Sequence, residues 1–530
     1  MVSFEKNTPP PVDQSNQMPG MVNRALRMML GTLASRVLGL LREVLTAVFF
    51  GATRTLDTFY VAYTLANLSR QLLAEGALSA SFVPVFSRVL KKNGEQASKQ
   101  LAQSVLSILL AACALVVLIG VLFSPVLVKI IAPGFDYEQR LAAVTFTRSL
   151  FPFLIIVSVG ALAMGVLNSI GSFFVPAIAP AVSNLAFIAI LLTFRQRISI
   201  WTLVTAVLAG GVCSMILQCA WAGRMGYPIL PLRPDLRNPD LRETLKLFLP
   251  YAAGLSLNQI NPVISRMLGS FLGDGVISVL NYADRIIQLP LGLFVIAISQ
   301  AVLPMLSRLD STDKNGFNIF LRDALRFNLF VVLPAALALI LTARPIVHIL
   351  LVRGAFNEWA WEATSGALAC YAAGLPGIAC NTVLMRALYA RSLPKEAVGV
   401  TIFTVCANLI LGAVLMQWFS HKGLALGTSC AFTGAAFLAA WLLARDLGVR
   451  IRLFESVWLL RLMISCSVMA VALIVIMRYH PYPVNSGFAW RLFWMTLVVV
   501  FGGLLYASVS TVLRCPEWTW IRHSFDKGKK

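Results

Sequence analysis

Charged side chains interrupt the segment Thr32–Thr46, TLASRVLGLLREVLT, which is otherwise apolar enough to cross a bilayer. At about 100° per residue, its polar residues share a sector of roughly 120° on a helix. They are Thr32, Ser35, Arg36, Gly39, Arg42, Glu43 and Thr46. An arginine at the centre of a membrane helix costs about 2.5 to 3.5 kcal/mol, and such residues usually line a water-filled path. The pattern predicts a cavity-lining helix face; the alternative is an Arg–Glu pair that only locks helices together.

Two further stretches carry charge in the same way. The polar residues of VISVLNYADRIIQLP, at 276–290, again share a sector of about 120°, and they are Ser278, Asn281, Asp284, Arg285 and Gln288. The stretch LDTFYVAYTLANLSRQLLAEGALS contributes Asp57, Asn67 and Arg70, and the segment before Ser278 contributes Arg266. For Asp57 a position at the membrane interface is the alternative, and for Arg70 the alternative is snorkelling to the surface.

The ligand that these arginines imply is an anion. The fixed fork of donors on a guanidinium suits phosphate and carboxylate, and it keeps its charge when desolvated. Glu43 and Asp284 are expected to hold the arginines in place while the cavity is empty. Gly39 lies between two of the arginines and weakens the helix by about 1 kcal/mol, so we expect a bend there where a gate moves.

The composition is that of a polytopic membrane protein. Of 530 residues, 58% are hydrophobic and 13% are charged, well outside the usual range of globular proteins. The formal net charge of +21 is accounted for by Lys and Arg in cytoplasmic loops, so no nucleic-acid partner is expected. The nine cysteines contain no CxxC or metal-ligand spacing, and we expect no metal site.

Apolar runs of about 20 residues, the length that spans a bilayer, predict an all-α fold of 14 transmembrane helices. Six fall near 25–51, 57–88, 101–132, 141–167, 174–195 and 199–223, and six more near 243–272, 275–307, 319–351, 359–388, 397–418 and 423–445. Two others lie near 456–478 and 488–513. The Pro- and Arg-rich connection Gly223–Asp240 separates two lobes of six helices.

The expected organisation follows from these spans. A disordered cytoplasmic tail covers 1–23, the N-terminal lobe 24–223, a cytoplasmic linker 224–240 and the C-terminal lobe 241–447. The last two helices occupy 448–515, and a basic cytoplasmic tail covers 516–530.

Lys and Arg concentrate in the loops that follow even-numbered spans, which places those loops and both termini in the cytoplasm. Exceptions in the other loops are Arg195, Arg197, Lys422 and Arg478. The segment ALSASFVPVFSRVLKKNG at 77–94 matches AISQAVLPMLSRLDSTDKNG at 297–316, and both halves have an even number of spans. Two pseudo-symmetric lobes with the same orientation are therefore predicted around a central cavity.

The segments ASRVLGLLREVL (34–45), GATRTLDTFYVAYTLANLSRQLLAEGALSASFVPVFS (51–87), IAPGF (131–135) and NYADRIIQLPLG (281–292) closely resemble the bacterial MurJ (MviN) family. These are lipid II flippases of the superfamily of multidrug and polysaccharide exporters. The resemblance covers essentially the whole chain, including the two extra C-terminal helices.

The resemblance implies a function and a set of residues. It implies transfer of lipid II, an undecaprenyl-diphosphate-linked disaccharide-pentapeptide, from the cytoplasmic to the periplasmic leaflet of the inner membrane by alternating access. Arg36, Arg42, Arg70 and Arg285 would bind the substrate, and Asp57 would be functionally sensitive. The last two helices would hold the lipid tail. No cofactor is expected; Na⁺ or the membrane potential would drive the cycle, and the other partners would be membrane lipids and peptidoglycan-synthesis proteins.

Two other functions fit parts of the sequence. A drug/cation antiporter on the same fold would use carboxylates in its cavity and 12 spans. A membrane-embedded glycosyl polymerase would use the same lipid substrate, although the chain has no GxxxxGK phosphate loop and no HExxH motif. We therefore expect a transporter and not an enzyme.

Overall fold

The computed structural model describes residues 36–71, 78–256, 259–296, 313–448 and 456–518, together with Ile298, Ser299, Val302 and Leu306. These residues form helices joined by short connections, with no strand among them. Ten helices in this part of the chain are long and apolar enough to cross a membrane. The predicted all-α membrane fold is confirmed.

The ten helices account for all but three of the predicted spans. Helix α16 (Pro394–Leu447) contains two spans, which are separated at Ser420 by a non-helical backbone with φ of 50°. Helix α3 (Leu78–Leu122) likewise passes a break at Gly94. The other three predicted spans, 25–51, 57–88 and 243–272, each include residues outside the described part. They also carry several of the charges expected to face the cavity, which lowers the hydropathy of their helices.

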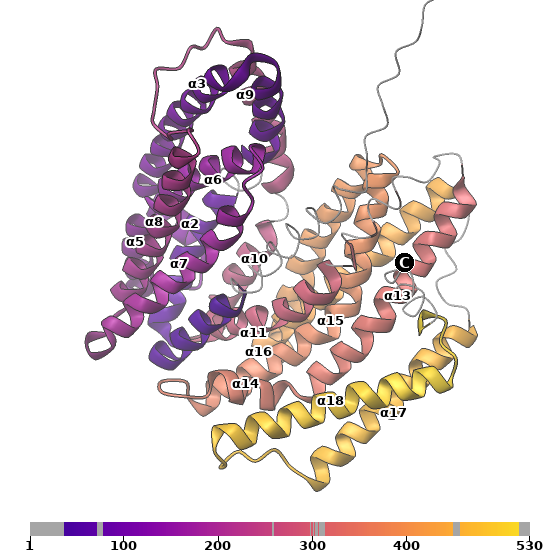
Figure 1. Cartoon of the computed structure of the whole chain (residues 1–530). Helices are drawn as coiled ribbons and strands as arrows, with labels where there is room; N and C mark the ends of the chain where they lie inside the picture. The colour runs from indigo at the N-terminus through magenta and orange to yellow at the C-terminus, as the bar shows by residue number, and fades with distance from the viewer. Residues whose placement is uncertain are drawn as a thin grey trace, which may run out of the picture.

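The N-terminal half is a bundle drawn in indigo to magenta in Figure 1. It begins with a helix over 36–50 and continues with α2 (Arg54–Arg70), α3, α4 (Ser124–Ile131), α5 (Tyr137–Leu150), α6 (Phe153–Ser169), α7 (Phe174–Thr193), the 3-10 turn η2 (Arg195–Arg197) and α8 (Ile200–Arg224). The main packing pairs are α7 with α8, α6 with α8, α3 with α6, and α2 with α5.

The C-terminal half lies beside it, in pink to orange. Its elements are α9 (Pro239–Ser256), α10 (Ile260–Gly269), α11 (Val276–Pro290), the π-helical turn η4 (Leu291–Ile296), α13 (Lys314–Leu341), α14 (Ala343–Leu351), α15 (Glu358–Ala390) and α16. Helix α15 is central, because it packs against α16, α13 and α11. The second copy of the sequence repeat at 297–316 falls mostly outside the described residues.

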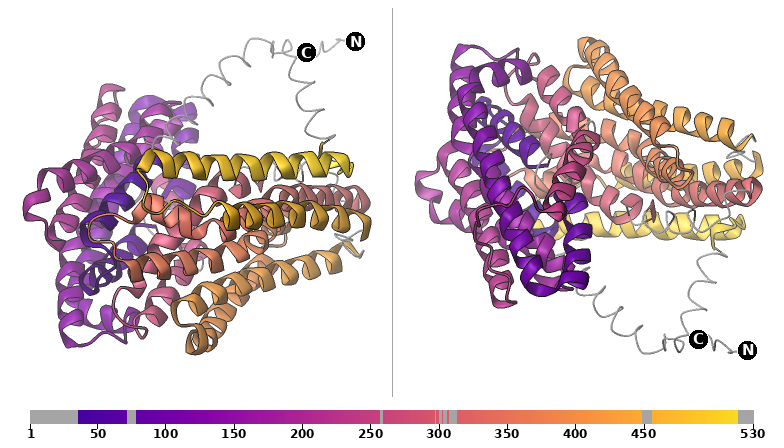
Figure 2. Two further views of the ribbon diagram at one scale, coloured as in Figure 1. Left: turned by 90° about the horizontal axis from the view of Figure 1, so that it is seen from below. Right: turned by 90° about the horizontal axis from the view of Figure 1, so that it is seen from above.

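The last two helices, α17 (Ser456–Tyr479) and α18 (Phe488–Val512), pack against each other and against α13. Figure 2 shows them as a pair along the C-terminal half. Their apolar contacts include Phe330 of α13 and Tyr506 of α18, whose hydroxyl donates to the Phe330 carbonyl at 2.7 Å. The exact limits of the two lobes and the terminal pair stay a prediction.

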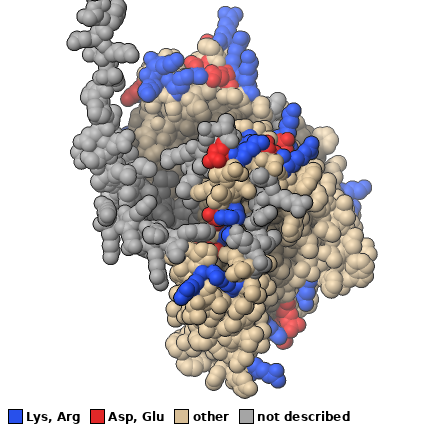
Figure 3. Space-filling view, turned by 90° about the vertical axis from the view of Figure 1, so that its right-hand side faces the viewer, with Lys and Arg blue, Asp and Glu red and all other residues tan. Residues whose placement is uncertain are grey.

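One helix of the second half reaches the first half at the end that carries many charges. Helix α9 packs against α3, and Arg88 donates to Glu243 at 2.9 Å. Figure 3 shows charged side chains dense at the upper end of the molecule and sparser below it. By the distribution of Lys and Arg in the loops, this end is the predicted cytoplasmic one.

At the opposite end, four glycines bring the backbones of the two halves into contact. A Cβ added to any of them would overlap a backbone carbonyl oxygen of the other half. The pairs are Gly51 with Ala355, Gly134 with Ser270, Gly275 with Ala52, and Gly354 with Val48. The Ala355 N–H also donates to the Val48 carbonyl at 2.8 Å. We call this contact the glycine seam. It lies in connections that the sequence predicts to be on the side of the membrane opposite to the cytoplasm.

The close contacts of the glycine seam predict that one added methyl group would weaken closure at this end of the protein. Gly134→Ala is the cleanest change because Gly134 does not have a positive φ. The overlap with Ser270 should cost about 1 to 3 kcal/mol, enough to shift a two-state balance about 5- to 150-fold. A cysteine at Ala283, which is fully buried, should then react faster with an impermeant thiol reagent added outside, on a cysteine-free background.

The matched control is Gly487→Ala, at a non-helical glycine with nothing within 4 Å of an added Cβ among the described residues. It should leave the labelling rate at its parent value. Equal labelling of the Gly134 variant and the parent protein, at equal amounts in the membrane, would show that the seam does not hold this end closed.

Candidate functional site

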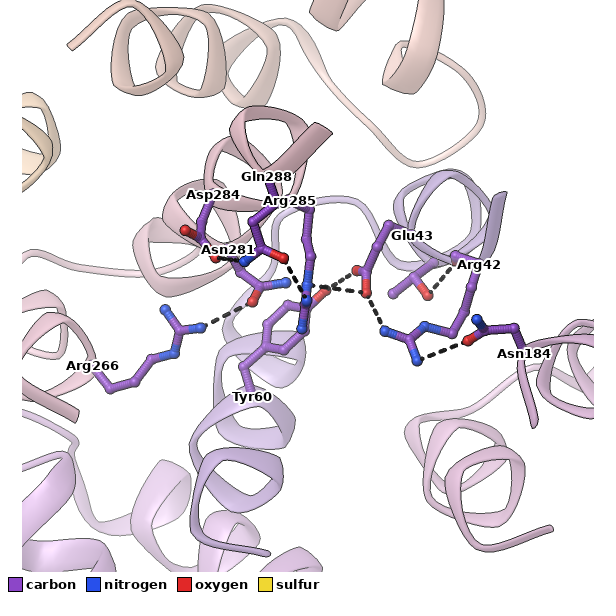
Figure 4. A network of polar contacts seen from close by, with 10 residues as sticks. Arg42, Glu43, Tyr60, Asn184, Arg266, Asn281, Asp284, Arg285 and Gln288 are labelled. Atoms are coloured by element: carbon purple, nitrogen blue, oxygen red, sulfur yellow. Dashed lines mark hydrogen bonds and ion pairs between the residues drawn. The ribbon is translucent and has the colours of Figure 1, made fainter. Parts of the chain in front are cut away.

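The site is centred on Glu43, which is 5% exposed and lies between two arginines (Figure 4). Arg42 donates to Glu43 Oε1 at 2.7 Å and to Asn184 Oδ1 at 3.3 Å. Arg285 of α11 approaches the same Oε1, with its Nε at 3.7 Å. The Tyr60 hydroxyl donates to the other carboxylate oxygen at 3.3 Å. Glu43 is therefore held firmly by its own half and loosely by the second half.

The predicted polar face of α11 continues this network in the second half. Gln288 donates to Asp284 at 2.7 Å and accepts from Arg285 at 3.2 Å. Arg266 of α10 donates to Asn281 at 2.9 Å. Figure 4 shows these side chains on α10 and α11, with Arg285 pointing toward Glu43. The sequence prediction that arginines from two distant segments meet is consistent with this arrangement.

Two pockets of about 230 Å³ each flank α2. The central pocket lies between α2 and the helices α10 and α11; among its lining residues are Asn67, Arg266, Asn281, Asp284, Arg285 and Gln288. The first-half pocket lies among α2, α6, α7 and α8; among its lining residues are Arg42, Tyr63, Arg70, Ser183, Asn184, Ser214, Met215 and Gln218. A smaller space of about 20 Å³, lined by Arg42, Glu43 and Arg285, shares residues with both.

These three spaces are lined by four arginines and two carboxylates, which gives a formal charge of +2. The carboxylates, Glu43 and Asp284, offset part of the cost of bringing so many cations out of water. Among the described residues there is no group of three or more His, Cys, Asp or Glu side chains that could hold a metal ion. The arrangement is suited to an anionic ligand with about two charges.

Arg70 and Asn67 form a local pair that joins the two pockets. Arg70 Nε donates to Asn67 Oδ1 at 2.8 Å, and Arg70 lines the first-half pocket while Asn67 lines the central one. Arg70 is therefore directed into the protein in this structure and does not serve only as a surface charge.

Asp57 and Ser278 lie away from the pockets described above, where they contribute to the seal between the halves. Asp57 is 1% exposed. Its carboxylate accepts from the Gly275 N–H at 2.6 Å, the Ser278 N–H at 2.7 Å and the Ser278 hydroxyl at 2.6 Å. A carboxylate at the N-terminus of α11 pairs with unfilled N–H groups and with the positive end of the helix dipole. Asp57 thus holds α11 to α2 beside the glycine seam, which differs from the cavity role expected for both residues.

The polar face predicted at 32–46 also includes Ser35, Arg36 and Gly39. Ser35 lies outside the described residues. Arg36 lies against η4, since a Cβ on Gly292 would overlap its guanidinium group. Gly39 is helical in this structure, with Asn184 Nδ2 at 3.5 Å from an added Cβ, so its role as a hinge stays a prediction.

An apolar groove of about 550 Å³ opens between α13 and the pair α17 and α18. Its lining includes Pro290 and Phe294, close along the chain to Gln288 of the central pocket. Phe330, Pro334, Met469, Val499 and Tyr506 also line it.

Several residues of the site were not predicted from the sequence. Tyr60 and Tyr63 are ordinary in an apolar segment, and nothing in their spacing shows that they face the network. Asn184 carried a signal, because an amide within the apolar run PAIAPAVSNLAFIAIL needs a partner. Its partner is Arg42.

The fold and the site together define a membrane transporter with a cationic cavity between two helical halves. A family model described as "Lipid II flippase MurJ" matches residues 46–498. A "Probable lipid II flippase MurJ" of Rhizobium tropici is 35% identical over 81% of this chain and 80% of its own length. The "Lipid II flippase MurJ" of Burkholderia cenocepacia is 34% identical over 74% of this chain and 78% of its own. The chain belongs to the MurJ family.

Solved structures support the same architecture. "Lipid II flippase MurJ, inward closed conformation" superposes with a TM-score of 0.75 at 24% identity, over 92% of this chain and 98% of that one. An inward-facing multidrug transporter of the MATE family superposes with a TM-score of 0.64 at 14% identity, over 78% and 94% of the two chains. These likenesses show the fold.

Gly39 gives a test of movement at the site. Gly39→Ala should support growth of a strain depleted of its own family member, because the added Cβ makes only ordinary contact with Asn184. Gly39→Leu should abolish growth, because a larger side chain would keep the helix from bending. Normal growth of a stably inserted Gly39→Leu protein would contradict the hinge.

Gly39→Leu could also abolish growth because the leucine crowds the side chain of Asn184. The double variant Gly39→Leu with Asn184→Ala removes the side chain that the introduced leucine would press on. It should remain inactive if bending is the cause; recovered growth would assign the defect to crowding.

Proposed function

We propose that this protein flips lipid II from the cytoplasmic to the periplasmic leaflet of the bacterial inner membrane by alternating access, for cell-wall synthesis. The observation that carries the proposal is the formal charge of +2 on the three neighbouring spaces, two between the halves and one within the first half. A diphosphate diester carries about two negative charges, and guanidinium groups bind phosphate oxygens in a fixed fork. Family membership supplies the particular lipid, since the named relatives are lipid II flippases.

The apolar groove supports a lipid-linked substrate over a free anion. Its distance from the network along α11 is short, as Gln288 lines the central pocket and Pro290 lines the groove. A polyprenyl tail in the groove would place the diphosphate near Arg285 and Arg266. Arg36, whose guanidinium lies against Gly292, between Gln288 and Phe294 along the chain, would meet the diphosphate on its way in.

In the proposed cycle this structure is closed at the periplasmic end. The glycine seam, the Asp57 contacts with α11 and the hydrogen bond from the Tyr282 hydroxyl to the Gly51 carbonyl at 2.8 Å all lie there. Opening requires their loss together, which favours a two-state movement of the halves. The proposal has both termini in the cytoplasm; this orientation and contact with peptidoglycan-synthesis proteins stay predictions.

Loss of either central arginine should stop transport. Arg42→Ala and Arg285→Ala should each abolish growth of a depleted strain while the protein still inserts, because each removes charge-assisted bonds to the diphosphate. Lysine should restore function only in part, since it lacks the fork. Arg478→Ala, at an exposed position in the last turn of α17, is the control for loss of an arginine and should grow normally.

The direct measurement for these variants is the leaflet distribution of lipid II in depleted cells. Accumulation in the inner leaflet with the alanine variants supports the proposal. Normal growth and normal distribution at native expression would make that arginine a structural residue. Formation of glycan by the pure protein in liposomes would instead indicate a polymerase.

The membrane potential should bias the cycle. Moving one charge across 100 mV is worth about 2.3 kcal/mol, so outward movement of a divalent diphosphate gains about 4 to 5 kcal/mol from an inside-negative potential. Arginines that accompany the ligand would cancel this gain and shift the effect of the field to the empty return step. Either way, collapsing the potential at constant ΔpH should change the accessibility of a single cysteine in the cavity. Unchanged accessibility and export would rule out coupling to the potential and point to an ion gradient.

A further inference from the structure

The first-half pocket lies farthest from the apolar groove. The groove is lined by the end of α11, η4, α13, α14, α17 and α18, the central pocket by α2, α10 and α11, and the first-half pocket by the helix over 36–50, α2, α6, α7 and α8. The substrate has a matching order, from lipid tail through diphosphate and disaccharide to peptide. If the tail lies in the groove and the diphosphate in the centre, the far pocket meets the far end of the substrate.

The chemistry of this pocket also differs from that of a phosphate site. Arg42 and Arg70 present cations to it, and carboxylates are natural partners for both. Gln218 is 7% exposed, and its Nε2 donates to the Ser214 carbonyl at 3.2 Å. No donor among the described residues reaches Gln218 Oε1, which is fully buried. A buried acceptor of this kind calls for an N–H or O–H donor, and an ionised phosphate diester has none.

A peptide supplies both kinds of group, carboxylates for the arginines and N–H groups for Gln218. The volume of about 230 Å³ is below the range of about 300 to 1,000 Å³ for drug-sized ligands. It suits the end of a peptide and not a disaccharide with its peptide. Met164, Met215 and Phe153 line the rest of the wall, where unbranched and aromatic side chains adapt to apolar parts of a ligand.

We propose that the first-half pocket is a subsite for the peptide of the lipid-linked substrate, which it recognises through peptide carboxylates and N–H groups. This inference rests on the proposed function. It separates two tasks among the arginines: Arg42, Arg266 and Arg285 hold the diphosphate, and Arg70 selects substrates that carry an acidic peptide.

The test compares three ligands on the purified full-length protein in nanodiscs. They are lipid II, the same diphosphate-linked disaccharide without peptide, and lipid II whose peptide carboxylates are amidated. Wild-type protein should bind lipid II about tenfold more tightly than either of the other two.

Two variants change the pocket in different ways. Gln218→Ala removes the unfilled acceptor, and Met215→Trp fills the space. Each should reduce the preference for lipid II over the peptide-free lipid to about twofold or less. The matched control is Ile216→Trp, on the same helix α8 but 56% exposed, which should keep the full preference.

The outcomes distinguish failure of the peptide subsite from failure of the proposed function. Equal weakening of lipid II and the peptide-free lipid by both pocket variants would overturn the proposal and assign the pocket to the diphosphate or the sugars. Full preference in both variants would overturn it as well. Failure of wild-type protein to bind any of the three lipids would instead contradict the proposed function, so the two failures are distinguishable.

Discussion

Charge that is buried in a membrane must be compensated by charge, and this constraint organises the interior of the protein. Arg42, Arg70, Arg266 and Arg285 line connected spaces in which Glu43 and Asp284 are the only carboxylates found along the described walls. Without those two acids, the desolvation cost of four cations would oppose folding. With two more acids, the cavity would have no attraction for an anion. The balance that remains, +2, keeps the cavity stable when empty and attractive to a diphosphate.

The distances around Glu43 show how binding would be coupled to movement. Within the first half, Arg42 Nη2 lies 2.7 Å from Glu43 Oε1. Across the halves, Arg285 Nε lies 3.7 Å from the same oxygen, which is a longer and weaker contact. Arg285 Nε makes no hydrogen bond to any described residue. A phosphate oxygen would satisfy that donor better than Glu43 does, because a charge-assisted bond at about 2.8 Å is much stronger than a contact at 3.7 Å. A ligand would therefore replace the ionic contact between the halves at the cost of little existing stabilisation.

The sequence predicted much of this molecule because a membrane restricts what a chain can do. Apolar runs located the helices, and the face shared by Asn281, Asp284 and Arg285 located one wall of the site. Periodicity on a single helix does not determine which helix lies opposite, so the meeting of Arg285 with Glu43 could be expected only in outline. The roles of Asn184 and Tyr60 are seen only in the structure, where α7 and α2 pack against the helix over 36–50. The contacts of Asp57 could not be predicted for a related reason: two of its three donors are the backbone N–H groups of Gly275 and Ser278, which leave no pattern in side chains.

The glycine seam explains why two halves with a continuous apolar core can still separate at one end. At the seam itself the contact is between backbone atoms, with carbonyl oxygens where a Cβ would otherwise lie, while side chains such as Tyr60 and Tyr282 pack across the halves beside it. At about 25 cal/mol per Å² of apolar surface, a seam of interlocked leucines would add several kcal/mol to each opening. Hydrogen bonds such as the one from Ala355 to Val48 are replaced by water at a net cost of about 0.5 to 1.5 kcal/mol each. Closure at the seam is thus set by a close fit of backbone atoms, and the exchange of one ionic contact for a ligand at Glu43 acts on the same interface between the halves.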